Sequence, residues 1–219
     1  MTTNRGNKNV RKEQHNSLTH RIRTGIYGGS FNPIHLGHTN LGEWLCQEGW
    51  VDELWFLVSP LNPLKVNDGN LLPDELRLQL TNLAVEESTT LKVSDFEMHL
   101  PRPSYMVNTL SQLRQAYPER EFILIIGADN WHRFSDWKNS DEILRHHHLV
   151  IYPREGFPID ASTLPQDVSL AQDAPLFSIS STDIRKAIAA GTCHGEWLAP
   201  KVWKEIKKRG YYTAKPLEA

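Results

Sequence analysis

The feature that most constrains the fold of this chain is a regular alternation of short apolar runs with longer stretches of helical periodicity. Runs typical of strands fall at 24–28, 54–58, 91–96, 121–126 and 148–152, with a sixth candidate at 176–179. Stretches typical of helices fall at 37–48, 73–86, 104–116, 140–146, 182–190 and 200–208. Strands rich in Ile, Leu, Val and Phe that alternate with helices indicate βαβ units on a parallel sheet.

Right-handed crossovers that cover both faces of such a sheet predict a Rossmann-like, doubly wound α/β fold. A length of 219 residues favours a single domain with a substantial core. Residues 1–23 are polar and lack apolar periodicity, so we interpret them as a disordered basic tail on a domain that spans 24–219.

The charge of the chain is divided unevenly between these two parts. Six basic side chains and one acid give residues 1–23 a formal charge of +5, which leaves −7 for the rest of a chain whose total is −2. A body at −7 argues against a nucleic-acid groove, which needs a dominating basic face. The sequence has neither an apolar run of membrane-spanning length nor a secretory signal, so we expect a soluble, cytoplasmic protein.

The strongest local motif is GIYGGSFNPIHLGH, which leaves the first predicted strand and enters a helix. Gly28 and Gly29 lack side chains, so a phosphate can approach the backbone there, next to the positive end of the helix dipole. His35 and His38 share a face of a helical turn and can donate hydrogen bonds to phosphate oxygens, more strongly when protonated. Gly37 between them leaves a hollow for a flat base. The alternative is a tight turn with histidines that cap or pack.

This motif closely resembles the (T/S)FDP–HxGH element of the nucleotidyltransferase superfamily, which binds a nucleoside triphosphate and stabilises charge as pyrophosphate leaves. A second element, FSISSTDIRKAIAAG, lies at 177–191. Its Ser180 and Asp183 have capping-box spacing, and Arg185 falls near a helix N-terminus, where a cation is disfavoured unless an anion is bound. The stretch ISSTDIR resembles the SSTxIR motif that places two hydroxyls and an arginine on ATP phosphates in HxGH adenylyltransferases.

Three middle segments resemble the nicotinate-mononucleotide adenylyltransferase family of bacterial NAD biosynthesis. The family pattern ELxRxGPSYTxxTL is matched at 97–110, IIGxD with FxxW at 125–137, and HLIVxxRxG at 148–156. With the two phosphate elements, the resemblance runs from residue 24 to about residue 212. It implies adenylyl transfer from ATP to nicotinate mononucleotide, which gives nicotinate adenine dinucleotide and pyrophosphate.

The resemblance also implies roles for individual residues. The catalytic group comprises His38 at the α-phosphate, His35 at the β- and γ-phosphates, and Arg185. The expected ATP-binding residues are Gly28, Gly29, Ser30, Phe31, Gly37, Gly127, Asp129, Ser180 and Ser181. The expected mononucleotide-binding residues are Lys65, Tyr105, Met106, Trp137 and Arg154, with Arg102 a weaker candidate at the rim.

Several of these positions also have structural interpretations. Asp129 follows a buried strand, where it can accept ribose hydroxyls, but a helix N-cap fits equally well. Trp137 offers a face on which a pyridine ring can stack, or it packs in the core. Arg154 and Arg102 either contact the mononucleotide phosphate or remain solvated at the rim of the site. The run His146–His148 does not predict a metal site, because adjacent side chains diverge and no acidic or Cys ligands stand at metal spacing.

Two departures from the family pattern affect the expected acceptor site. Met106 stands where the family usually has Thr, so a hydroxyl contact is lost and recognition of the nicotinate carboxylate rests on backbone amides. The loop at 60–65, PLNPLK, is shorter than the family's PxxxPPHK and lacks its histidine, although Lys65 keeps the expected phosphate role.

The resemblance implies direct in-line attack of the mononucleotide phosphate on the α-phosphorus of ATP, without a covalent intermediate. Catalysis is then positioning plus charge stabilisation, with Ser30, Ser180 and Ser181 assisting the catalytic group. Mg²⁺ is expected to arrive with ATP rather than in a protein cage. The expected partners are ATP and nicotinate mononucleotide, with no nucleic acid and no membrane, and the oligomeric state stays open.

Other functions fit the sequence less well. Pantetheine-phosphate and glycerol-phosphate nucleotidyltransferases share the first element but not the others at this spacing. Aminoacyl-tRNA synthetases also need a KMSKS-like loop and a tRNA-binding domain, and the sequence shows neither. A non-catalytic nucleotide sensor has no need of His35, His38 and Arg185, and a DNA-associated role would rest on the basic tail alone.

Overall fold

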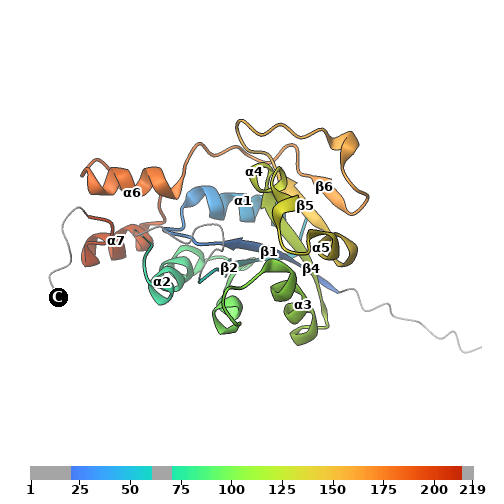
Figure 1. Ribbon diagram of the computed structural model, residues 1–219. Helices are drawn as coiled ribbons and strands as arrows, with labels where there is room; N and C mark the ends of the chain where they lie inside the picture. Colours follow the sequence, from blue (N-terminus) through green and yellow to red (C-terminus); the bar gives the residue numbers. More distant parts are fainter. Residues whose placement is uncertain (1–20, 61–70, 214–219) are drawn as a thin grey trace, which may run out of the picture.

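A computed structural model describes residues 21–60 and 71–213. Six strands form one parallel sheet in the order β3-β2-β1-β4-β5-β6 (Figure 1). They are β1 (Ile22–Gly29), β2 (Glu53–Val58), β3 (Leu91–Ser94), β4 (Arg120–Gly127), β5 (Leu149–Tyr152) and β6 (Val168–Leu170). The strand order reverses between β1 and β4, which is the place where doubly wound sheets bind ligands. The predicted Rossmann-like α/β fold is confirmed.

Each predicted helix lies within two residues of an observed one. The helices are α1 (Leu36–Gln47), α2 (Asp74–Val85), α3 (Met106–Ala116), α4 (Ala128–Trp131), α5 (Ser140–His146), α6 (Ser181–Ala189) and α7 (Pro200–Arg209). Three short 3₁₀ turns are η1 (Phe96–His99), η2 (Phe134–Asp136) and η3 (Ala161–Thr163). No helix in the described ranges is both long enough and apolar enough to cross a bilayer.

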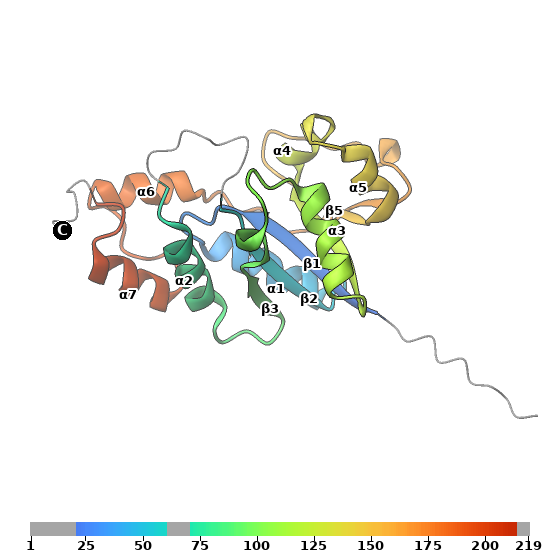
Figure 2. The same cartoon turned by 60° about the horizontal axis from the view of Figure 1, so that its bottom comes forward.

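The core consists of one apolar cluster on each face of the sheet, because successive side chains of a strand point to opposite faces. Tyr27 of β1 and Ile125 of β4 belong to the cluster that packs against α1, α2, α6 and α7. Ile26 and Leu124 belong to the cluster that packs against α3 and α5. Helices α2 and α7 lie side by side, which brings the C-terminal region against the first half of the sheet (Figure 2).

The sixth strand differs from its prediction at 176–179, which was wrong. The structure places β6 at Val168–Leu170, where the buried Val168 pairs with Leu149 of β5. Residues 176–179 are extended but outside the sheet, and Leu176 is 61% exposed. Phe177 and Ile179 pack partly against the first cluster, so their apolar character reflects packing on other side chains rather than strand pairing.

The first strand begins two residues before its predicted start at residue 24. Strand β1 begins at Ile22, and Arg23 is part of the sheet because it pairs with Glu121 of β4; its guanidinium also donates to the Asp52 carboxylate at 2.7 Å. Residues 1–20 of the predicted tail lie outside the described residues.

A polar cluster joins four strands at the end of the sheet opposite to the carboxyl ends of β1 and β4. Glu53, the first residue of β2, accepts hydrogen bonds from Thr24 at 3.0 Å, Trp55 at 2.8 Å and Lys92 at 2.5 Å. The Arg120 guanidinium of β4 also donates to this carboxylate. Burial alone raises the pKa of Glu53, but the hydrogen bonds from Lys92 and Thr24 and the charge of Arg120 outweigh it and lower the pKa.

This lowered pKa predicts a pH-dependent contribution to stability. In the unfolded chain Glu53 titrates near its ordinary value of 4.5. Its contribution is therefore fully present above about pH 4.5 and is lost as the pH falls through the lower pKa of the folded state. We expect Glu53→Gln to reduce the free energy of unfolding by about 2 kcal/mol at pH 7, since charged hydrogen bonds are lost. In urea titrations this difference should shrink at pH 3.

The matched control is Glu119→Gln, which removes an acid 3.4 Å from the same Arg120 but 58% exposed. An exposed pair contributes little, so this variant should lie within about 0.5 kcal/mol of the parent protein at either pH. A Glu53→Gln variant whose loss is the same at pH 3 and pH 7 would contradict the assignment.

Candidate active site

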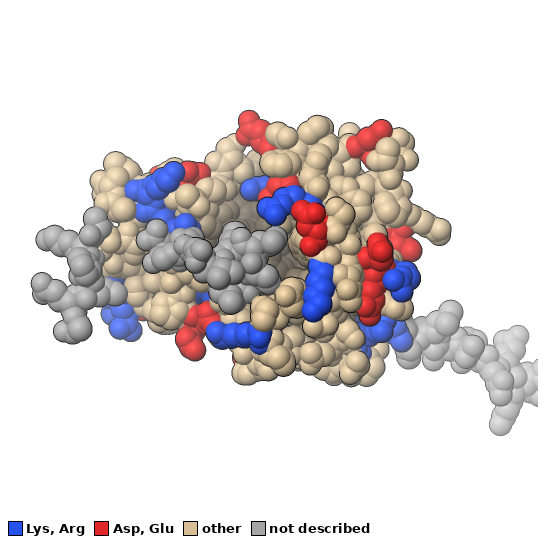
Figure 3. Space-filling model, in the orientation of Figure 1, with Lys and Arg blue, Asp and Glu red and all other residues tan. Residues whose placement is uncertain are grey.

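A cavity of about 180 Å³ opens beyond the carboxyl ends of β1 and β4. Figure 3 shows that this face of the molecule is hollowed at its centre, with charged side chains of both signs around the rim. The lining residues come from the strand ends, the loop before α3 and the segment after η2: Tyr27, Gly28, Gly29, Ser59, Glu97, Ser104, Tyr105, Met106, Leu124, Ile125, Ile126, Gly127, Asn130, Asp136, Trp137, Lys138 and Tyr152. The cavity therefore occupies the topological switch point.

The two histidines of the first motif lie together at the start of α1. His35 is the N-cap residue, and its ring stacks on that of His38 with centroids 3.7 Å apart. The backbone N–H of His35 donates to Nδ1 of His38 at 3.3 Å. Because Nδ1 accepts, a neutral His38 carries its proton on Nε2. The rings of Tyr27 and Phe31 contact His38 edge to face and fix its orientation.

The burial of His35 determines the charge of its imidazole. Burial, together with the positive charge of Arg154, lowers the pKa of His35 to about 4. Its Nδ1 atom is buried and has no hydrogen-bond partner among residues 21–60 and 71–213. At neutral pH the imidazole is therefore an uncharged polar group when no ligand is bound.

We expect His35 to titrate with a midpoint near pH 4 in the protein without ligand, because ionisation must overcome burial. Histidine side-chain resonances followed by NMR between pH 3 and pH 8 measure this directly. His99, which is 73% exposed, provides the internal comparison. A His35 resonance that titrates above pH 6 would contradict the buried, neutral state.

The adjacent glycines of the motif lie close to the side chains of Met106 and Phe31. A Cβ atom on Gly28 would lie 2.9 Å from the terminal methyl of Met106, and one on Gly29 would lie 2.9 Å from the Phe31 ring. Phe31 itself has a φ of +42°, a conformation that is uncommon outside glycine and that concentrates at functional sites. A Cβ atom on Gly37 would lie 3.0 Å from Nδ1 of His35 and 3.1 Å from Phe177, so little open space remains beside this glycine.

The second motif docks on the first, although about 150 residues separate them. Ser180 is the N-cap of α6, as its spacing predicts, and its hydroxyl accepts from the backbone N–H of Asp183 at 3.1 Å. Ser181 donates to the Pro33 carbonyl at 2.9 Å. Arg185 donates to the Asn32 carbonyl at 2.8 Å. The fold thus brings the two predicted phosphate elements into direct contact.

Asp129 occupies the first turn of α4, beyond the end of β4. The N-cap is Gly127, so the interpretation of Asp129 as an N-cap is wrong. A Cβ atom on Gly127 would lie 2.4 Å from Oδ1 of Asp129, so only glycine lets the carboxylate fold over the strand end. That Oδ1 atom is buried without a hydrogen-bond partner in the described part of the chain, and Nε of Arg154 lies 3.7 Å from it. The carboxylate therefore has an oxygen that accepts no hydrogen bond from the described residues.

The predicted pyridine-binding residues gather at the other side of the cavity. Tyr105 is the N-cap of α3, Met106 is its first residue, and Trp137 faces them from the segment after η2. Trp137 also packs on Phe134 with centroids 5.3 Å apart, which agrees with the packing interpretation, while its stacking on a pyridine ring stays a prediction. Lys65 lies outside the described residues. Arg102 pairs with Asp74 at 2.8 Å and does not line the cavity.

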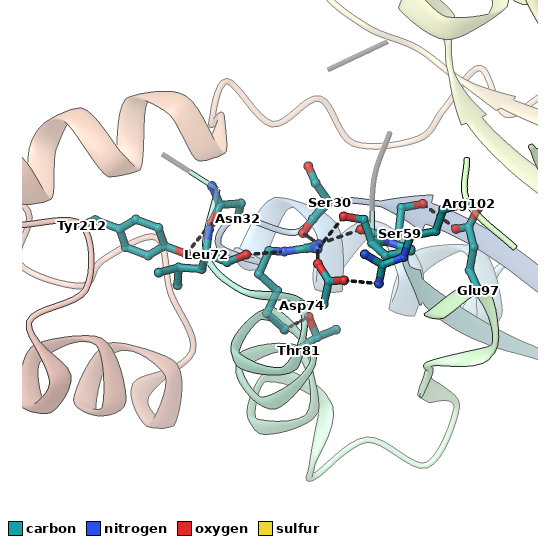
Figure 4. Close-up of polar contacts among 11 residues, drawn as sticks. Ser30, Asn32, Ser59, Leu72, Asp74, Thr81, Glu97, Arg102 and Tyr212 are labelled. Atoms are coloured by element: carbon teal, nitrogen blue, oxygen red, sulfur yellow. Dashed lines mark hydrogen bonds and ion pairs between the residues drawn. The ribbon is translucent and has the colours of Figure 1, made fainter. Parts of the chain in front are cut away.

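Arg77 is a residue that sequence reasoning missed. It is fully buried in α2 and donates to the carbonyls of Leu72 at 3.0 Å, Ser30 at 2.5 Å and Ser59 at 2.9 Å, and to the Asp74 carboxylate at 2.6 Å. Figure 4 labels these four partners. This side chain joins the first motif to the end of β2. The available signal was an arginine on the apolar face of a helix, three residues before Leu80.

The floor of the cavity contains a second missed feature, a pair of tyrosines. The hydroxyl oxygens of Tyr27 and Tyr152 lie 2.8 Å apart. Burial raises the pKa of both phenols, so both stay protonated at neutral pH. One proton forms the mutual hydrogen bond, and the other has no acceptor among the described residues. The pair therefore offers one donor to a ligand in the cavity.

Comparison with known proteins places this geometry in a family. A model of cytidylyltransferase-like proteins matches residues 26–187. A protein of Bacteroides fragilis is 53% identical over 186 residues, which cover 85% of this chain and 92% of that protein. A protein of Bacteroides thetaiotaomicron is 50% identical over 190 residues, which cover 87% and 93%. Both relatives bear the name "Probable nicotinate-nucleotide adenylyltransferase".

Solved structures agree on the fold. The nicotinic acid mononucleotide adenylyltransferase of Plasmodium falciparum, complexed with NaAD, superposes with a TM-score of 0.72 at 21% sequence identity. The match covers 87% of this chain and 97% of that one. The complex of that enzyme with APC gives a TM-score of 0.71 at 20% identity.

Proposed function

The chain belongs to the nicotinate-nucleotide adenylyltransferase family, and on that premise we propose how its site performs the family's reaction. The reaction is the transfer of the adenylyl group of ATP to nicotinate mononucleotide, which gives nicotinate adenine dinucleotide and pyrophosphate. A phosphate oxygen of the mononucleotide forms a bond to the α-phosphorus, and the bond from that phosphorus to the β-phosphate bridging oxygen breaks. The observation that carries the proposal is the contact of the two phosphate motifs beside the switch-point cavity.

The two substrates are assigned to opposite sides of the His38 imidazole. ATP lies along the first and second motifs, with its ribose hydroxyls directed to Asp129, whose Oδ1 accepts no hydrogen bond from the described residues. Nicotinate mononucleotide occupies the cavity, with its pyridine ring between Tyr105 and Trp137. Arg154 lies near the mononucleotide phosphate. This arrangement brings the attacking phosphate and the α-phosphate together, which supplies much of the rate enhancement.

A small group of hydrogen-bond donors stabilises the negative charge on the ATP phosphates. Nε2–H of His38 is directed at the α-phosphate by the hydrogen bond that Nδ1 accepts from His35. Arg185 and the hydroxyls of Ser180 and Ser181 serve the β- and γ-phosphates together with His35. Negative charge on a nearby polyphosphate favours the imidazolium form, so nucleotide binding is expected to raise the pKa of His35 from about 4.

The metal is proposed to be Mg²⁺ that enters with ATP. Among residues 21–60 and 71–213, no group of three His, Cys, Asp or Glu side chains is placed to hold a metal ion. Mg²⁺ keeps several waters and commonly binds through substrate phosphates, which fits a site without a dedicated cage. When bound, it neutralises charge on the phosphates as pyrophosphate departs.

The proposed partners are these two nucleotides, in the cytoplasm, where ATP is abundant. The basic residues before β1 are proposed to be an appendage to the catalytic domain rather than a part of the site. No nucleic acid or membrane enters the reaction.

The decisive experiment is a pyrophosphate-release assay with ATP and Mg²⁺, run in parallel with nicotinate mononucleotide, with nicotinamide mononucleotide and with no acceptor. We expect rapid release with the nicotinate compound and none without an acceptor. The dinucleotide product, identified by mass spectrometry, should form in equal amount to pyrophosphate. Failure to turn over either mononucleotide would overturn the proposed function.

A further inference from the structure

One cation stands at the pyridine side of the cavity. Lys138 directly follows Trp137, and its Nζ lies 4.3 Å from the centroid of the Tyr105 ring. Among the described lining residues it is the sole Lys or Arg. The two acids of the lining have other partners, because Asp136 lies 3.7 Å from Arg133 and Glu97 accepts from Ser59 at 2.5 Å. A cation–π contact thus holds the ammonium over the cavity wall.

Hydrogen-bond donors without acceptors surround the same space. Ser104 is 5% exposed and lines the cavity, and its Oγ has no partner in the described part of the chain. Nε1 of Trp137 is likewise buried and without a partner there. The backbone N–H of Met106, the first residue of α3, belongs to the unpaired first turn of that helix. Two N–H groups, a hydroxyl that can donate and one cation suit a carboxylate.

We propose that Lys138 is a specificity residue that selects the carboxylate of nicotinate mononucleotide against the carboxamide of nicotinamide mononucleotide. The inference rests on the proposed function and deepens it. Hydroxyl and amide donors bind a carboxylate oxygen and a carboxamide oxygen alike, so they discriminate weakly. An ammonium attracts the charged carboxylate and disfavours the carboxamide NH₂, so it separates the two.

This role also accounts for the departure at Met106. A threonine hydroxyl at that position, as the family usually has, supplies a neutral contact that methionine cannot. Instead, the Met106 methyl packs against Gly28, where it closes the space above β1. The side chain of Lys138 restores a polar contact from the opposite wall, and it does so with a full charge.

The test compares kcat/KM for the two mononucleotides in four proteins: the parent, Lys138→Met, Lys138→Arg and Lys204→Met. Methionine keeps the aliphatic length of lysine and removes the charge. We expect Lys138→Met to lower the ratio of nicotinate to nicotinamide kcat/KM about 10-fold, since a hydrogen bond to a charged group is lost. Turnover of the nicotinamide compound should stay unchanged or rise. Lys138→Arg should keep the parental ratio, because it retains the charge and the ring contact.

Lys204 is an exposed lysine of α7 outside the cavity lining, so its replacement controls for a general loss of positive charge. A parental ratio in Lys138→Met would overturn the role, and so would an equal loss of turnover with both compounds. A parent enzyme that uses both compounds equally well would overturn it too, while leaving the adenylyl-transfer function intact. A parent that uses neither would instead remove the proposed function on which the inference rests.

Discussion

His38→Ala is expected to lower kcat about 10²- to 10³-fold, the range measured when a single donor to a developing oxyanion is deleted. The reason is the position of its Nε2–H, which the hydrogen bond from the His35 backbone N–H to Nδ1 directs outward. Charge on the α-phosphate grows as the bond to pyrophosphate breaks, so the loss falls on the transition state. KM for both substrates should change less than kcat. Steady-state pyrophosphate release at saturating ATP measures the effect.

Two further variants sharpen this prediction. His38→Asn retains an N–H donor on a shorter side chain, so it should recover part of the lost rate. His99→Ala, an exposed histidine on η1, controls for the removal of an imidazole elsewhere and should keep the parental kcat. Thermal unfolding of each variant establishes that it is folded. A folded His38→Ala protein with nearly parental kcat would refute the assigned role.

The fold was predictable because its signals are local. Each buried strand of the parallel sheet shows as an apolar run, and each helix has its own periodicity, so five of the six strands and all six predicted helices are found within a few residues. Strand β6 was missed because it is three residues long and only Val168 is buried. The stretch at 176–179 has a stronger apolar signal, but it packs on side chains and has no partner strand.

Some features of the site are likewise predicted by local motifs, whereas others depend on tertiary contacts. The contiguous motifs identify His35, His38 and Arg185 as residues of one site, and the fold brings their motifs together. The hydrogen bond between Tyr27 and Tyr152 joins residues that are 125 positions apart. The sequence around each tyrosine contains no motif that predicts this contact. The neutral state of His35 depends on burial, which no residue pattern reports.

The acidic body of the chain is compatible with polyphosphate binding because the site relies on directed groups rather than on bulk charge. The N-termini of α1 and α6 both face the region where the two motifs meet. The cavity lining in the described residues includes one cation and two acids that are already partnered. Directed donors of this kind need little reorganisation when the reaction begins, which is the condition for electrostatic catalysis.

Arg77→Met is expected to lower the free energy of unfolding by about 3–5 kcal/mol, the cost of breaking a buried charged network by removing one partner. The guanidinium is fully buried and donates to carbonyls of three separate segments, at Ser30, Ser59 and Leu72. Methionine fills the volume but leaves those carbonyls without their donor, and it leaves the Asp74 carboxylate paired with Arg102 alone. Urea unfolding at pH 7 measures the loss. The stability of Arg77→Lys should fall between that of the parent and that of Arg77→Met, because an ammonium keeps the charge but cannot reproduce the planar guanidinium fork.

The matched control is Arg102→Met, since Arg102 pairs with the same Asp74 from the solvent side and is 54% exposed. It should cost less than about 1 kcal/mol, as exposed pairs do. An Arg77→Met protein as stable as Arg102→Met would refute the network.

Kinetics of the folded Arg77→Lys protein then separate an effect on positioning from an effect on stability. Arg77 holds the Ser30 carbonyl within the first motif, so loosening it displaces the residues that precede His35 and His38. We therefore expect kcat about 10-fold lower in Arg77→Lys and unchanged in Arg102→Met, because a small misplacement of reacting groups has a large effect on rate.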